Sequence, residues 1–299
     1  MNKGQAAFHT YTTLSRCLAA LPEPVAMGMA AVAADVLFRV GGNPRRTVTN
    51  NLRRVLDSDG ADTALLDRWA RRSYRAYARY WVEGARLGTT SPLEVEARTL
   101  AQGLEYLVDG MATGKGVIMA LPHVGSWEFG GAFLATQGLP MTAVAERVEP
   151  PELFEFMMAQ REAMGLIVVP LDESTPSAIM ATLRNGGLVG LLSDRDLTGK
   201  GIDVEFFGEK ATMPAGPATL ALRSGAALVT GAVYSGPGAD HRAVVQPPLD
   251  TTRHGSFRAD VTRLTQAIAT RFEGLIRQAP EQWHVFQPLW SVDRSDGAA

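Results

Sequence analysis

Hydrophobic positions in the first third of the chain recur with a helical period. The segments with this spacing are residues 14–21, 24–40 and 62–87. Gly41-Gly42-Asn43-Pro44 is expected to stop the second helix, because glycine and proline interrupt helical backbone. Asp62 and Gly88 are expected as the N-cap and the C-terminal stop of the third. The pattern therefore predicts a helical N-terminal part.

From about residue 100 onward, short apolar runs alternate with segments of helical spacing. The runs are residues 117–120, 142–145, 166–171, 188–192, 204–207, 227–234 and 243–246. The helical segments are residues 126–135, 151–164, 175–184, 216–222 and 258–277. Strands that alternate with helices indicate βαβ units, so the fold is predicted to be α/β, with a largely parallel central sheet flanked by helices. Residues 281–289 are expected to form a closing strand or an aromatic loop.

Length and composition suit one domain with a large core. The 299 residues are 46% hydrophobic. The predicted domain covers residues 1–299, with a helical N-terminal part over 1–95 and an α/β core over 100–290. The longest uncharged stretch near the N-terminus, residues 24–34, is shorter than the roughly 20 residues of a membrane-spanning helix. With no secretory signal in residues 1–11, a soluble or membrane-surface protein is expected.

Charge and cysteine content exclude several classes of function. The net charge of −2 gives no reason to expect a nucleic-acid partner. Residues 1–90 nevertheless hold 13 Lys and Arg against 7 Asp and Glu, whereas the remainder holds 16 against 24. The single cysteine, Cys17, excludes an internal disulfide and a cysteine-based metal cluster. No metal site is therefore predicted, and the positive N-terminal part is the candidate contact with an anionic surface.

Aromatic and arginine side chains are interleaved along residues 62–87. The residues concerned are Arg68, Trp69, Arg71, Arg72, Tyr74, Arg75, Tyr77, Arg79, Tyr80, Trp81 and Arg86. Such a pattern suits a membrane interface, where rings lie at headgroup depth and cations meet anionic lipid. The same pattern also fits a helix whose rings lie in the core and whose arginines are solvated. Both interpretations remain open from the sequence.

A histidine and a glutamate stand five residues apart where a predicted strand meets a predicted helix. His123 follows the apolar run 117–120 and Pro122, and Glu128 lies in the first turn expected after it. A carboxylate on one ring nitrogen sets the tautomer and leaves the other nitrogen free to take a proton. None of the other four histidines has a carboxylate placed in this way. His123 is thus the candidate general base, although a histidine after a strand can equally be a capping or core residue.

Polar residues also follow the apolar run 188–192, in the segment Ser193-Asp194-Arg195-Asp196. Open α/β sheets bind ligands at the carboxyl ends of their parallel strands, so this segment is expected to share one rim with His123. Its carboxylates suit the hydroxyls of a polyol acceptor, and its arginine suits a phosphate or a developing oxyanion. The alternative is a surface turn that satisfies its own hydrogen bonds.

Further candidates lie outside these two segments. Arg147, Arg161 and Glu146 follow the run 142–145 and are candidate contacts for substrate. Phe206 and Phe207 either line an apolar tunnel or pack in the core. No GxSxG, HExxH or GxGxxG pattern is present, so no motif supports a serine-hydrolase, zincin or dinucleotide-binding function.

Taken together in chain order, these segments resemble the lysophospholipid-acyltransferase superfamily. The closest resemblance is to its bacterial branch of lipid A biosynthesis and phosphatidylinositol mannoside acyltransferases. His123 and Glu128 match the H(x)4D/E motif of that family. The later blocks are Ser193-Asp194-Arg195-Asp196, Val204-Glu205-Phe206-Phe207-Gly208 and Met213-Pro214-Ala215-Gly216-Pro217. The Asp-Arg-Asp block and the Arg/Ala-rich composition look more like the mannoside branch. Lipid A enzymes usually begin with a membrane-spanning helix, which is not evident here.

The resemblance implies a single acyltransferase domain that acts in glycolipid and phospholipid metabolism as a peripheral protein on the cytoplasmic face of the cell membrane. The implied reaction moves a long-chain acyl group from acyl-CoA to a hydroxyl of a membrane glycolipid. The favoured acceptor is a mannose of phosphatidylinositol mannoside. No cofactor is implied, because acyl-CoA is a co-substrate. His123 would be the base and Glu128 would orient it. The implied substrate contacts are Glu146, Arg161, Asp194, Arg195, Asp196 and Glu205.

The implied chemistry agrees with what the residues can do. A thioester is already reactive, so the missing component is a deprotonated alcohol, which a positioned imidazole supplies. Alternatives are a lipid A-type enzyme that takes lauroyl or myristoyl groups from acyl carrier protein, a thioesterase, and a non-catalytic lipid-binding module. No motif separates acyl-CoA from acyl carrier protein as the donor.

Overall fold

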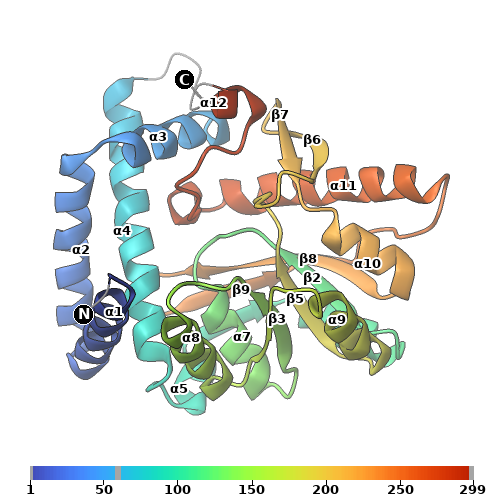
Figure 1. Cartoon of the computed structure of the whole chain (residues 1–299), viewed down its shortest axis with the longest axis horizontal. Coiled ribbons are helices and arrows are strands. Elements are labelled where there is room, and N and C mark those ends of the chain that lie inside the picture. The colour runs from blue at the N-terminus through green and yellow to red at the C-terminus, as the bar shows by residue number, and fades with distance from the viewer. Residues whose placement is uncertain (1–2, 58–61, 296–299) are drawn as a thin grey trace.

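The computed structural model describes residues 3–57 and 62–295, and its N-terminal part is helical (Figure 1). Its helices are α1 (Lys3–Ala20), α2 (Glu23–Val40), α3 (Asn43–Val55), α4 (Thr63–Leu87) and α5 (Pro92–Ala97). The predicted helices are confirmed, and α2 ends at Val40, directly before the predicted glycine stop. Asp62 caps α4 by accepting a hydrogen bond from the Ala64 backbone nitrogen at 2.9 Å, and Gly88 follows its last residue.

A mixed seven-stranded sheet forms the centre of the molecule, in the order β1-β9-β8-β2-β5-β3-β4. Its strands are β1 (Thr99–Gln102), β2 (Val117–Leu121), β3 (Met141–Ala145), β4 (Ile167–Pro170), β5 (Leu188–Leu192), β8 (Ala227–Ser235) and β9 (His241–Val245). Only the β8–β9 pair is antiparallel. A separate hairpin joins β6 (Ile202–Phe206) to β7 (Glu209–Met213). The predicted α/β fold with a largely parallel sheet is therefore confirmed.

Helices cover both faces of the sheet (Figure 1). They are α6 (Leu104–Ala112), α7 (Trp127–Thr136), α8 (Pro151–Ala163), α9 (Thr175–Arg184), α10 (Gly216–Ser224) and α11 (Phe257–Arg277), and a short α12 (Ser291–Ser295) ends the described chain. Residues 281–289 form the predicted aromatic loop, which begins at the 3₁₀ turn η1 (Pro280–Gln282). The edge strand β1 was not predicted, because its four residues alternate between half-buried and exposed and contain no apolar run.

The alternation of side chains on β2 divides the core into two layers. Ile118 and Ala120 point to the layer with α9, α10 and α11, while Val117 and Met119 point to the layer with α6, α7 and α8. All five residues of β2 are buried. A strand covered on both faces needs apolar residues at consecutive positions, which explains the unbroken run in the sequence.

Of the five aromatic side chains of α4, Tyr74 is buried, Trp81 is exposed and the other three are half-buried. Tyr74 is 8% exposed, and its ring meets those of Phe38 and Phe286 at centroid distances of 5.7 and 5.1 Å. The arginine face is partly neutralised, since Asp35 on α2 binds both Arg71 and Arg75. Of the two interpretations of this helix, the structure supports core packing for Tyr74.

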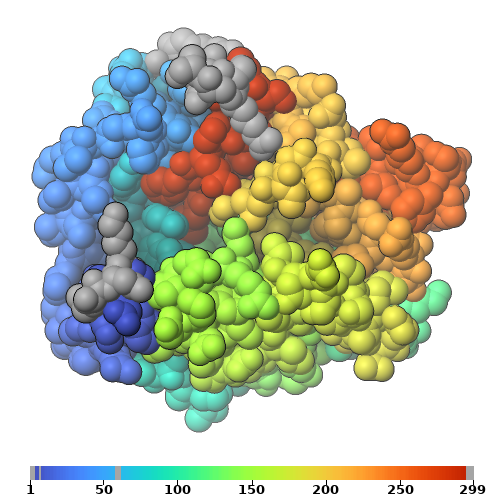
Figure 2. Space-filling view, in the orientation of Figure 1, coloured from blue at the N-terminus to red at the C-terminus, as the bar shows by residue number. Residues whose placement is uncertain are grey.

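Two features of the N-terminal part bear on how the protein meets its surroundings. Within residues 3–57 and 62–295, no helix alone has the length and apolar content of a membrane span; only α2 and α3 together reach it, with a bend of 97° between them. In Figure 2 the surface is hollowed where the blue N-terminal helices, the green α8 region and the red C-terminal segment meet.

Candidate active site

The pairing of two neighbouring strands brings His123 and Asp194 together. Strands β2 and β5 are parallel neighbours, and Leu121 stands opposite Leu192 at their carboxyl ends. His123 and Asp194 each lie two residues beyond those ends, so the same register places them side by side. The imidazole Nδ1 of His123 lies 2.5 Å from the carboxylate Oδ1 of Asp194. The predicted shared rim is thereby confirmed for these two residues.

The Asp194 carboxylate is fully buried and accepts three hydrogen bonds. Its Oδ2 accepts from the His123 backbone nitrogen at 2.9 Å and from the indole Nε1 of Trp283 at 2.8 Å, in addition to the ring contact at Oδ1. Burial raises the pKa of Asp194, but the His123 ring and the hydrogen bonds lower it by more, so the net pKa is below its usual value. The carboxylate is ionised at neutral pH and can only accept.

An ionised Asp194 sets the proton position on His123. Because the carboxylate has no proton to donate, Nδ1 of the neutral ring must carry the hydrogen, and Nε2 keeps its lone pair. The His123 side chain is 20% exposed, so the ring reaches the surface. Nη1 of Arg195 lies 3.5 Å from Nε2, while its Nε is buried and has no partner among the described residues. A basic nitrogen and a guanidinium group therefore lie next to each other at the carboxyl edge of the sheet.

Backbone contacts hold the loop that carries His123. Gly125 has a φ of +61°, and a Cβ there would lie 1.9 Å from the carbonyl oxygen of Val233. Only glycine fits this approach, which lets the Gly125 nitrogen donate to Gln282 at 2.9 Å. The His284 nitrogen donates to the carbonyl oxygen of His123 at 2.7 Å. The base is thus placed by the sheet on one side and by the C-terminal loop on the other.

Glu128 does not contact the His123 ring, and the predicted hydrogen bond between them is wrong. Its Oε1 accepts from the hydroxyl of Tyr80 on α4 at 2.9 Å and from Nη2 of Arg161 on α8 at 3.1 Å. Its Oε2 has no partner among the described residues. The helix α7 turns the side chain toward α4 and α8, so Glu128 joins three helices while Asp194 occupies the place beside the ring.

Glu128→Ala is expected to lower the free energy of unfolding by roughly 2–4 kcal/mol, because it leaves the Arg161 guanidinium without its carboxylate at a site only 15% exposed. Urea denaturation measures the change. Glu146→Ala is the matched control, since Glu146 is exposed and makes no ion pair with the described residues; it should shift the value by less than about 0.5 kcal/mol. An unchanged denaturation midpoint with lost turnover would instead place Glu128 directly in the reaction.

The other predicted contact residues fall into two groups. Glu146 follows β3 at the same carboxyl edge of the sheet as His123. Asp196 caps its own turn instead, accepting from the backbone nitrogens of Thr198, Gly199 and Gly201 at 2.9–3.1 Å. Glu205 is exposed on β6, where its backbone pairs with Gln266 of α11. Among the described residues, no interaction joins Asp196 or Glu205 to the His123–Asp194 pair. The alternative of a surface turn that satisfies its own hydrogen bonds therefore holds for Asp196 but not for Asp194.

Two further candidates make packing contacts within the protein. Arg161 stacks its guanidinium 5.2 Å from the centroid of Trp127 while it binds Glu128. Phe206 is fully buried against Phe207 and Trp290, with ring centroids 4.5 and 6.0 Å away. The core interpretation, rather than an apolar tunnel, therefore holds for the phenylalanine pair.

Sequence reasoning missed Trp283 and Tyr80 as parts of this site. Trp283 reaches Asp194 from a loop 89 residues further along the chain, and Tyr80 reaches Glu128 from 48 residues before it. The only signal in the sequence was the aromatic content of both segments, which does not identify a partner. Among residues 3–57 and 62–295, no group of three or more His, Cys, Asp or Glu side chains is placed to bind a metal ion.

Comparisons with known proteins match this chain to acyltransferases. The profile described as bacterial lipid A biosynthesis acyltransferase matches residues 4–291. The chain is 37% identical over 297 residues to the phosphatidylinositol mannoside acyltransferase of Mycolicibacterium smegmatis, covering 98% of this chain and 94% of that protein. It is 38% identical over 284 residues to the protein of the same name from Mycobacterium tuberculosis H37Rv, covering 93% and 86%. A lipid A biosynthesis acyltransferase of Haemophilus influenzae is 23% identical over 195 residues, covering 64% and 59%.

Proposed function

Because this chain belongs to the bacterial lipid A biosynthesis acyltransferase family, we propose that it transfers a long-chain acyl group from acyl-CoA to a hydroxyl of a membrane glycolipid, with a mannose of phosphatidylinositol mannoside as the acceptor. Two relatives that are 37–38% identical over nearly the whole chain are named phosphatidylinositol mannoside acyltransferases, which supports this class of acceptor. The observation that carries the mechanism is the His123–Asp194 pair at the carboxyl edge of the sheet.

His123 acts as the general base in this proposal. Its Nε2 takes the proton of the acceptor hydroxyl as the oxygen attacks the thioester carbonyl carbon. The carbon–sulfur bond then breaks, and the departing thiolate takes the proton from Nε2, so that the ester and the free thiol are the products. Asp194 stabilises the imidazolium that exists between the two proton transfers, as the carboxylate of a catalytic triad does.

Arg195 is the candidate group for the oxyanion. Its guanidinium lies 3.5 Å from Nε2, within reach of a carbonyl attacked beside that nitrogen. A cation placed where negative charge develops lowers the barrier most when the site excludes water. The acceptor hydroxyl needs the same Nε2 lone pair, so Arg195 moves from the ring to the carbonyl oxygen when substrates bind.

Glu146 and Arg161 remain the proposed contacts for the polar part of the substrates. Glu146 is exposed at the sheet edge, and its carboxylate suits a sugar hydroxyl. Arg161 uses Nη2 on Glu128, which leaves the other donors of its guanidinium for a phosphate.

Attachment to the cytoplasmic face of the membrane is proposed from an apolar stripe on α2. Its members are Val25, Met29, Val32, Val36 and Val40, which are between 48% and 79% exposed. Their spacing places them on one face of the helix, away from the side that packs on α4. Arg39 and Arg46 are exposed nearby and suit anionic headgroups. An apolar face with basic neighbours is typical of helices that lie in the membrane interface.

Val36→Asp is expected to weaken binding to anionic phospholipid vesicles about tenfold or more, since it removes an apolar contact and adds a charge. Co-sedimentation with vesicles measures the effect. Val108→Asp is the control, because Val108 on α6 has the same 50% exposure as Val36 but lies outside the stripe. Equal losses in both variants would remove α2 as the membrane contact.

The function itself is tested by incubating the full chain with long-chain acyl-CoA, or acyl carrier protein, and a panel of membrane glycolipids, with the product identified by mass. Acylated phosphatidylinositol mannoside formed from acyl-CoA supports the proposal. Thiol release at a comparable rate without acceptor would indicate a thioesterase. Stoichiometric lipid binding without thiol release would indicate a lipid-binding module, and product formed only from acyl carrier protein would change the donor.

A further inference from the structure

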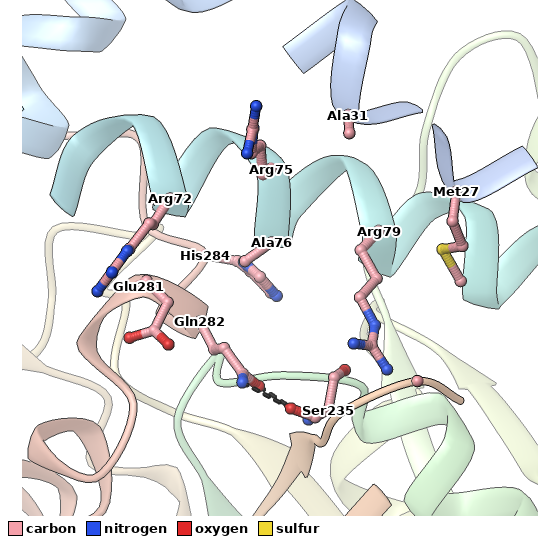
Figure 3. A pocket seen from close by; sticks show the side chains of 11 residues that line it. Met27, Ala31, Arg72, Arg75, Ala76, Arg79, Ser235, Glu281, Gln282 and His284 are labelled. Atoms are coloured by element: carbon pink, nitrogen blue, oxygen red, sulfur yellow. Dashed lines mark hydrogen bonds between the residues drawn. The ribbon is translucent and has the colours of Figure 1, made fainter. Parts of the chain in front are cut away.

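An open cavity of about 460 Å³ lies between α2, α4, the end of β8 and η1 (Figure 3). None of the residues that line it takes part in the proposed reaction. Its volume falls within the roughly 300–1,000 Å³ of ordinary small-ligand sites. The chemistry of its walls therefore indicates which ligand it suits.

Three arginines of α4, Arg72, Arg75 and Arg79, line the cavity and differ in how their hydrogen-bond donors are used. Arg75 shares the Asp35 carboxylate with Arg71 and binds its two oxygens at 2.8 and 2.6 Å. Arg79 gives Nε to Glu83 and Nη1 to the carbonyl of Gly236, but its Nη2 is buried without a partner among the described residues. A buried guanidinium nitrogen that lacks an acceptor favours an anionic oxygen from outside the chain.

Arg72 is the second guanidinium with free donors. It lies 5.1 Å from the Trp69 ring centroid and makes no ion pair or hydrogen bond with the described residues. The single carboxylate of the lining, Glu281, lies on the side of the cavity near Arg72 and makes no ion pair with it (Figure 3). Arg72 and Arg79 are seven residues apart on one helix, a rise of about 10 Å. A ligand that reaches both is longer than a phosphate ion.

The remaining walls are neutral. Burial lowers the pKa of His284 to about 3, with a smaller contribution from His123, so this ring carries no charge near neutral pH. Met27 and Ala31 of α2 point toward the cavity from the other side and give it an apolar wall (Figure 3). Guanidinium groups with unused donors along one wall and apolar side chains opposite suit a phosphate attached to a carbon skeleton.

We propose that this cavity binds a phosphate ester, with Arg72 and Arg79 as ligands of its oxygens. Guanidinium groups match phosphate in charge and in hydrogen-bond geometry. The ester is either a soluble sugar or polyol phosphate, or the headgroup of a phospholipid. The site also adjoins the catalytic loop, because Gln282 and His284 line the cavity and their backbones bind Gly125 and His123.

Isothermal titration of the full chain tests the proposal, with glycerol 3-phosphate as the soluble ester, dihexanoyl phosphatidylglycerol below its micelle concentration as the lipid headgroup, and glycerol as the uncharged probe. We expect one bound ester per chain and no binding of glycerol. Tighter binding of glycerol 3-phosphate identifies a soluble ligand, and tighter binding of the short-chain lipid identifies a headgroup.

Two variants locate the bound ester. Arg72→Gln should weaken binding at least about tenfold, since a hydrogen bond to a charged group is worth that much. Ala31→Phe should block the cavity without changing charge. Arg68→Gln, an exposed arginine on α4 outside the cavity, and His123→Ala should bind as the wild type does. The proposal is overturned if neither ester binds at millimolar concentration, if Arg68→Gln and Arg72→Gln weaken binding equally, or if Ala31→Phe binds normally.

Discussion

Replacing His123 with alanine is expected to lower the rate of acyl transfer by a factor on the order of 10²–10⁴. The variant lacks the nitrogen that takes the acceptor proton, while the thioester and the acceptor can still bind. The rate is measured with acyl-CoA and phosphatidylinositol mannoside as release of free thiol that depends on acceptor.

A second histidine provides the control for this variant. His254 lies in the loop before α11 with a side chain 58% exposed, so His254→Ala should keep the wild-type rate. Circular dichroism and donor binding check that His123→Ala is folded. If the folded variant retains its turnover, the proton must be taken by another group, and the general-base mechanism fails.

Asp194→Asn is expected to lower the rate by a similar factor, on the order of 10²–10⁴, without moving the ring. Both groups that face Oδ2, the His123 nitrogen and the Trp283 indole, are donors, so the amide oxygen must occupy that position. The amide nitrogen then faces Nδ1 and donates to it. The ring proton moves to Nε2, and the lone pair that the acceptor hydroxyl needs is lost.

Trp283→Phe is the comparison for Asp194→Asn, since it removes one donor to the same carboxylate but leaves the tautomer unchanged. It should reduce the rate much less than Asp194→Asn. Equal rate losses in the two variants would show that the carboxylate only supports the fold at this point.

The same variant has a consequence for stability at acid pH. The pKa of Asp194 is lower in the folded protein than its usual value, so its contribution to folding is present above about pH 4 and is lost as the pH falls through the folded pKa. The difference in free energy of unfolding between wild type and Asp194→Asn should therefore narrow below about pH 4. Urea denaturation at pH 7 and pH 3.5 measures it, and a constant difference would contradict the assigned ionisation.

Much of the fold follows from local patterns. The apolar run 188–192 and the helical segment 175–184 have the bounds of β5 and α9, because strand and helix periods are properties of neighbouring residues. The stripe on α2 is also visible as a helical pattern. The exposure of this stripe cannot be seen in the sequence, because an apolar helix face has the same pattern whether it packs in the core or meets solvent.

His123 and the polar segment after β5 were both found from the sequence, since each follows a buried strand. The partner of His123 was not, and the error has a physical cause. Glu128 is only five residues away along the chain, but the first turn of α7 directs it to Tyr80 and Arg161. Proximity in sequence therefore gave the wrong carboxylate.

The sequence by itself determined most of the element types, the largely parallel sheet, the candidate base and the resemblance to an acyltransferase family, because each depends on local periodicity or a short motif. Only the tertiary structure decided that β5 lies beside β2 and that Leu121 pairs with Leu192. That register, set by long-range hydrogen bonds and by the packing of both sheet faces, brings Asp194 to His123 across 71 residues. The same long-range packing places Arg72 and Arg79 along a cavity, with the Nη2 of Arg79 left without a partner among the described residues.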